Sequence, residues 1–147
     1  MKLVVINMIS KSFANSVNAA IFGGAPLEID TWYFGLTTQD IIDGVIPDGS
    51  ELKTNGYARY PLPNNNSSFN TPAYSSTTPI SSVTNAKNIV YNIFSSPEIL
   101  VTNWFMSKEQ TGNTVEIWGK FKTPISLNTG TQVTIPAGNL ILTINNG

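Results

Sequence analysis

Residues 99–144, ILVTNWFMSKEQTGNTVEIWGKFKTPISLNTGTQVTIPAGNLILTI, decide the fold class of this chain. Aromatic and β-branched runs alternate here with short segments rich in Gly, Asn and Pro, a pattern typical of strands joined by turns. Every second residue is apolar at Leu140, Leu142 and Ile144, as in a strand with one buried face. The stretch predicts strands at residues 99–106, 115–123, 132–135 and 140–144.

Three further strands are expected upstream, at residues 29–36, 57–62 and 88–94. The first, IDTWYFGL, is aromatic and β-branched and has two alternative buried faces. One face consists of Ile29, Thr31, Tyr33 and Gly35, and the other of Trp32, Phe34 and Leu36. Strands at this spacing with little helix predict an all-β fold, a β-sandwich or jelly-roll-like domain.

One short N-terminal helix is expected over residues 10–23. Phe13, Val17 and Ile21 recur at i, i+4 and i+8, Ser10 or Ser12 can cap the start, and Gly23-Gly24 ends the pattern. We expect this helix to lie across an open face of a sheet. Packing on a neighbouring subunit is the alternative.

The length of 147 residues fits a single domain spanning residues 1–147. Residues 63–87 differ from the rest because they consist mostly of Asn, Ser, Thr and Pro. We interpret them as a polar excursion outside the core. Four large apolar residues are expected to anchor it on this subunit or the next: Phe69, Tyr74, Ile80 and Val83.

Charge is scarce: 12% of residues are charged and the formal net charge is −1. Without a basic cluster, the chain is not expected to bind nucleic acid. Its apolar runs are shorter than the roughly eighteen residues of a membrane-spanning helix, so no membrane insertion is expected. A near-neutral surface gives little repulsion between copies and favours permanent assembly.

Histidine and cysteine are both absent. This removes the usual general base near neutral pH, the Ser-His and Cys-His nucleophile pairs, and zinc sites built on imidazole or thiolate. Two carboxylates can hydrolyse glycosides without histidine, but the sequence does not single out such a pair. We therefore predict no catalytic residues, no cofactor and no enzymatic activity.

Four carboxylates lie within twelve residues, at Asp40, Asp43, Asp48 and Glu51. Oxygen ligands of this kind can hold Ca²⁺, although the spacing does not match an EF-hand loop. Acidic residues near turns more often serve solvation and backbone capping. We therefore predict no metal site.

Arg59 is the only arginine in the chain, and Tyr57 precedes it by two residues. In a strand the two side chains would point to the same face. Because a guanidinium group can make two-point bonds to a carboxylate or to carbonyls, we interpret Arg59 as a structural clamp. Recognition of an acidic partner is the alternative.

Aromatic side chains gather in the predicted strands. Flat rings could form a platform for sugars, but their apolar neighbours favour core or subunit-interface positions. The residues concerned are Trp32, Tyr33, Phe34, Trp104, Phe105 and Trp118. Together with Tyr57, Arg59, Phe69 and Tyr74, we regard Trp104 and Trp118 as candidate structural or contact residues.

Several short motifs carry a family resemblance. They are WYFGL at 32–36, GYAR at 56–59, VTNWF at 101–105 with Thr111-Gly112, and the segment 118–140 that ends in AGNL. On these motifs the chain resembles short phage structural proteins of the tail-fibre and minor-tail type. Asn103, Lys108 and Thr131 depart from the family's usual residues, so no family role is carried over to them.

The resemblance implies a non-enzymatic structural protein of a tailed bacteriophage virion. It would be an oligomeric surface subunit of the head, as a decoration protein or head fibre, or of the tail, as a fibre or minor tail protein. The expected partners are other copies of the chain, with a trimer favoured by analogy, and other phage structural proteins. The alternative is a module at a tail tip that binds a receptor or a host-surface glycan.

Overall fold

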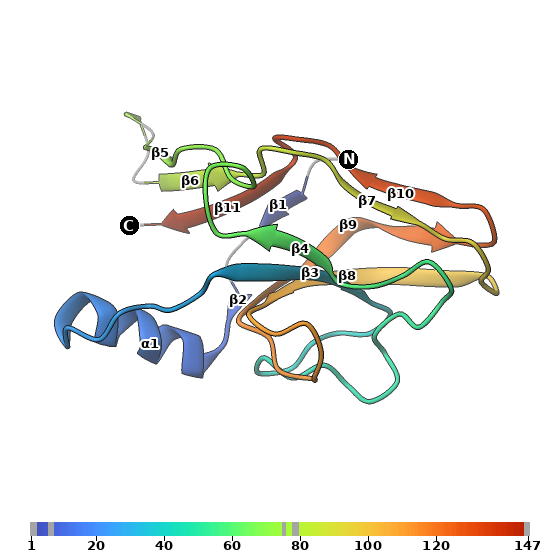
Figure 1. Ribbon diagram of the computed structural model, residues 1–147, viewed down its shortest axis with the longest axis horizontal. Helices are drawn as coiled ribbons and strands as arrows, with labels where there is room; N and C mark the ends of the chain where they lie inside the picture. The colour runs from blue at the N-terminus through green and yellow to red at the C-terminus, as the bar shows by residue number, and fades with distance from the viewer. Residues whose placement is uncertain (1–2, 6–7, 75, 78–79, 146–147) are drawn as a thin grey trace.

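The computed structural model describes residues 3–5, 8–74, 76–77 and 80–145 of the protein. Two layers of strands lie one above the other, and one helix extends from their end (Figure 1). This arrangement confirms the predicted all-β sandwich with one short N-terminal helix.

The lower layer in Figure 1 is an antiparallel five-stranded sheet. Its strands, in spatial order, are β2 (Met8–Ile9), β9 (Ile117–Leu127), β8 (Ile99–Ser107), β3 (Thr31–Thr37) and β4 (Tyr60–Pro63). The strands β8 and β9 form a long hairpin, with a register irregularity between Val101 and Asn103. The strand predicted at residues 57–62 corresponds to β4, which begins later than expected, at Tyr60.

The upper layer consists of a four-stranded and a two-stranded sheet. The first contains β1 (Leu3–Val5), β11 (Leu140–Asn145), β6 (Ile80–Thr84) and β5 (Ala73–Tyr74); the second contains β10 (Gln132–Ile135) and β7 (Ile89–Asn92). The strand β1 pairs with β11 in parallel, and β6 pairs with β11 in antiparallel orientation. This layer thus joins the start, the middle and the end of the chain.

The core lies between the two layers. From β3, the face with Trp32, Phe34 and Leu36 is the one buried in this core. The upper layer contributes Ile89, Tyr91, Val133, Ile135 and Leu140. The rings of Phe34 and Trp104 are stacked, with centroids 5.6 Å apart.

The helix α1 (Lys11–Phe22) begins after Ser10, whose side chain accepts a hydrogen bond from the Phe13 amide at 3.1 Å. It does not lie across a sheet, and no residue of α1 is buried. The two strand layers already cover each other, so the helix extends past their end (Figure 1). Phe13 meets Trp32 edge to face at 5.7 Å between centroids. Within the described residues, no helix has the length and apolar character needed to cross a membrane.

Residues 63–87 differ from a simple polar excursion. They contain β5 and β6, and β6 is a paired strand of the upper layer. Phe69 is buried in the main core, whereas Tyr74 on β5 is exposed. This stretch therefore contributes directly to the sandwich.

Candidate functional site

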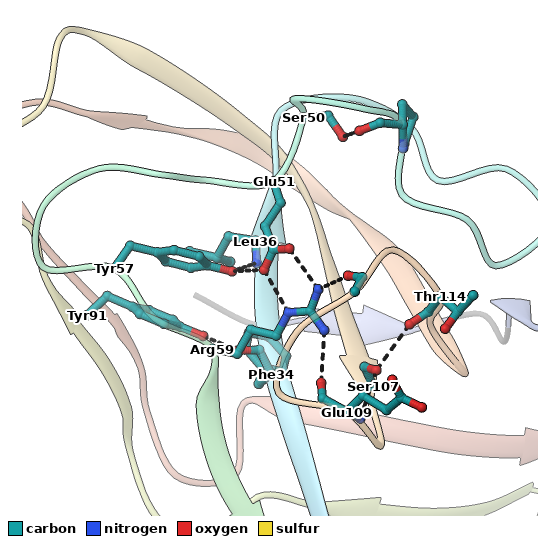
Figure 2. A network of polar contacts seen from close by, with 12 residues as sticks. Phe34, Leu36, Ser50, Glu51, Tyr57, Arg59, Tyr91, Ser107, Glu109 and Thr114 are labelled. Atoms are coloured by element: carbon teal, nitrogen blue, oxygen red, sulfur yellow. Dashed lines mark hydrogen bonds and ion pairs between the residues drawn. The ribbon is translucent and has the colours of Figure 1, made fainter.

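Arg59 lies in the segment that connects β3 to β4, and its side chain is 2% exposed. Its Nε donates to Glu51 Oε1 and its Nη2 to Glu51 Oε2, both at 2.7 Å (Figure 2). Two parallel bonds of this kind are the strongest form of ion pair that a protein makes with arginine. The Glu51 side chain is 23% exposed, so the pair lies just beneath the surface.

The same guanidinium group also holds the connection between β8 and β9. Its Nη1 donates to the Glu109 carbonyl at 2.9 Å, and Nη2 donates to the Gly112 carbonyl. Gly112 has a φ of 102°, a left-handed conformation that favours glycine. The guanidinium carbon lies over the Phe105 ring, 4.8 Å from the ring centroid. Arg59 thus ties two connections to each other and to the core.

Tyr57 completes the network from the other side of Glu51. Its hydroxyl donates to Glu51 Oε1 at 3.0 Å and accepts the amide N–H of Leu36 at 3.0 Å. Burial, followed by the charge of Glu51, raises the pKa of Tyr57 far above its usual value. The phenol therefore stays neutral and remains a hydrogen-bond donor. Its ring stacks on Tyr91, whose own hydroxyl donates to the Phe34 carbonyl at 2.5 Å.

The geometry favours a clamp over a recognition site. Each nitrogen of the Arg59 guanidinium already donates to an acceptor within the chain. An acidic partner would have to displace these bonds in order to bind. Tyr57 and Arg59 converge on Glu51 even though residues 57–59 precede the strand. The contribution of this network to stability stays a prediction.

Three of the four acidic candidates for a metal site, Asp40, Asp43 and Glu51, have separate places in the structure. Asp40 pairs with Lys120 at 2.7 Å on the surface, and this hydrogen bond lowers the pKa of Asp40. Asp43 lies in a turn with a φ of 51°, and Glu51 pairs with Arg59. Across the part of the chain that the structure describes, three or more Asp, Glu, His or Cys side chains do not gather as metal ligands would.

The aromatic candidates do not form a flat surface platform. Trp104 is buried against Phe34 in the main core. Trp118 belongs to a second buried cluster, with Ile41, Ile46, Phe105 and Val115. Its Nε1 meets no hydrogen-bond partner among the residues that the structure describes. These rings pack within the subunit, so they are not available for stacking on a sugar.

Sequence reasoning missed the partners of Arg59. The acidic cluster presents Glu51 as a possible metal ligand, whereas its position eight residues from the single arginine indicates an ion pair. The carbonyls of Glu109 and Gly112 carry no side-chain signal, so their role could not be predicted.

The fold and this closed network define a small all-β sandwich protein whose buried polar groups serve its own structure. The family described as Podophage GP4 fiber I protein gp80 matches residues 8–143. The chain therefore belongs to this family, which confirms its resemblance to phage fibre-type structural proteins. A comparison with curated proteins found no match.

Proposed function

We propose that this protein is a non-enzymatic structural subunit of a tailed-phage particle, exposed on the surface of its head or its tail. The family match carries the proposal, because it spans the helix and strands of both layers. The low charge of the chain supports it, since near-neutral surfaces assemble with little repulsion.

Residues 1–147 act in this proposal as a single domain. The main core supports this, because strands of both layers contribute to it. Several copies associate, with a trimer favoured, and they contact other structural proteins of the particle. Light scattering of the pure protein should report a mass that is a multiple of 15.9 kDa. A monomer at every concentration would refute self-association.

The absence of catalysis is part of the proposal. Retaining glycosidases place two carboxyl groups about 5 Å apart and inverting ones about 6.5–9.5 Å apart, with both groups free to act on the substrate. Here Glu51 is bound to Arg59 and Asp40 to Lys120, so these two carboxylates are not free to act as such a pair. We expect no hydrolysis of glycans or peptides by the pure protein. Turnover that a single carboxylate substitution abolishes would overturn this expectation.

Intact particles provide the decisive test. We expect mass spectrometry to detect the chain in washed virions and a map of the particle to place the sandwich on the outer surface. Its position in that map assigns the head or the tail. Absence of the chain from washed, infectious particles would refute a structural role.

A further inference from the structure

The last turn of α1 exposes two large apolar side chains, here called the Ile21–Phe22 pair. Ile21 is 63% exposed and Phe22 is 84% exposed. The helix extends beyond the sandwich (Figure 1), and none of its residues is buried. A helix of 12 residues is marginal in water unless another surface covers its apolar side. The free subunit therefore leaves this apolar surface uncovered.

An apolar groove opens between the two strand layers, and it is lined by Trp32, the ring against which Phe13 of the same helix packs. Its volume is about 610 Å³, within the range of sites that bind ligands or side chains. Both layers contribute to its walls: Trp32, Phe69, Val83, Met106, Ile117 and Leu142. The described residues that line the groove include no Asp, Glu, Lys or Arg. Phe22 does not fill it within its own chain, given its exposure.

We propose that the Ile21–Phe22 pair of one copy inserts into the apolar groove of a neighbouring copy. This inference rests on the proposed oligomeric subunit and identifies its contact surface. The two surfaces match in charge, because the described lining of the groove has no charged side chain and the one charged residue of α1 is Lys11, at the opposite end of the helix. Burial of the Ile21–Phe22 pair in the groove therefore leaves no charged group without a partner. Such a head-to-tail contact closes into a ring, such as a trimer, when the rotation between copies permits.

The first test is the double variant Ile21→Asn/Phe22→Asn. Both side chains are exposed, so the fold should persist, which circular dichroism and the melting temperature will show. Burial of two large apolar side chains implies that self-association weakens by roughly a hundredfold or more. Phe94→Ser is the matched control, because Phe94 is 68% exposed on the connection between β7 and β8, which lies at the end of the molecule opposite α1 (Figure 1). Sedimentation of this control should match that of the wild type.

The second test uses Asn66→Arg, at an exposed position on the groove wall. The bulky charge should obstruct the groove and weaken self-association. An equimolar mixture of this variant with Ile21→Asn/Phe22→Asn should recover one-to-one pairs, because one partner keeps an intact helix end and the other an intact groove. A helix-to-helix contact would give neither the defect in Asn66→Arg alone nor the recovery in the mixture.

The outcomes separate this inference from the proposed function. If the wild type associates and Ile21→Asn/Phe22→Asn associates equally well, the contact surface is wrong while the oligomer stands. If the wild type is a monomer throughout, the oligomeric subunit fails and the contact fails with it. The alternative occupant of the groove is a glycan, and a panel of soluble bacterial surface oligosaccharides tests for its binding. Binding that Asn66→Arg abolishes without changing self-association would assign the groove to a glycan and overturn the inference.

Discussion

Replacement of Arg59 by Lys tests the clamp while keeping its positive charge. The wild-type side chain donates two bonds to Glu51 and one bond each to the carbonyls of Glu109 and Gly112. An ammonium group lacks the planar fork, so Lys cannot reproduce the two-point pair and still reach both carbonyls. The substitution should therefore destabilise the folded subunit.

The expected size of this loss follows from the bonds. A hydrogen bond to a charged group contributes about 1.5–3 kcal/mol, and Lys loses about two of them, which gives roughly 3–6 kcal/mol. We reduce this to about 2–4 kcal/mol, because Glu51 is partly exposed and water can replace some bonds. For a chain of this length, the melting temperature should fall by roughly 4–16 °C.

Urea unfolding followed by tryptophan fluorescence measures this loss as a free energy of unfolding. Lys120→Met is the control, because Lys120 forms an exposed ion pair and its loss should cost less than about 1 kcal/mol. In a Glu51→Gln background, Arg59→Lys should cost less than in the wild type, since the two residues are coupled. An Arg59→Lys protein within about 0.5 kcal/mol of the wild type would refute the clamp.

Three other changes have defined outcomes. Burial raises the pKa of Glu116, so its stabilising contribution is complete below the ordinary value of 4.5 and is lost as pH rises through the folded pKa. The melting temperature of Glu116→Gln, measured relative to that of the wild type, should therefore rise between about pH 4 and pH 7. A difference that stays constant with pH would contradict this. In Gly35→Ala the new Cβ would lie 2.1 Å from the Phe105 ring, so thermal unfolding should show a loss of about 1–3 kcal/mol or more, and unchanged stability would contradict the packing. Replacing residues 63–87 with a Gly-Ser linker removes β6 and Phe69, and circular dichroism should show loss of the fold; a native spectrum would make the segment dispensable.

Strands that carry their own pattern could be predicted from the sequence. The C-terminal strands β8 to β11 combine apolar runs with Gly-containing turns, and their predicted positions agree with the structure to within a few residues. The strand β6, ISSVT, is rich in serine and threonine, and it is stabilised by pairing with β11 far along the chain. The short strands β1 and β2 depend on similarly distant partners, β11 and β9, whereas β5 pairs with β6, the next strand along the chain. Local propensity does not report such pairing.

The network around Arg59 shows a similar limit. A single arginine beside a tyrosine predicts a structural centre, because a guanidinium group is costly to bury without partners. Its acceptors depend on how the β8–β9 connection folds, since two of them are backbone carbonyls. Whether α1 covers a sheet was equally undetermined by sequence, because an apolar stripe does not specify which surface it meets.

The Arg59 network and the end of α1 should act at different stages. The network is closed within one chain, so it fixes the β8–β9 connection in the free subunit and should influence folding before any assembly. The Ile21–Phe22 pair is exposed and belongs to neither hydrophobic cluster of the described residues, so it should influence association of subunits that have already folded. Arg59→Lys should therefore lower the melting temperature while folded protein still associates, whereas Ile21→Asn/Phe22→Asn should weaken association at an unchanged subunit stability. If Arg59→Lys instead abolished association of fully folded protein, the β8–β9 connection would belong to the contact surface, and the division between a folding site and an assembly site would be wrong.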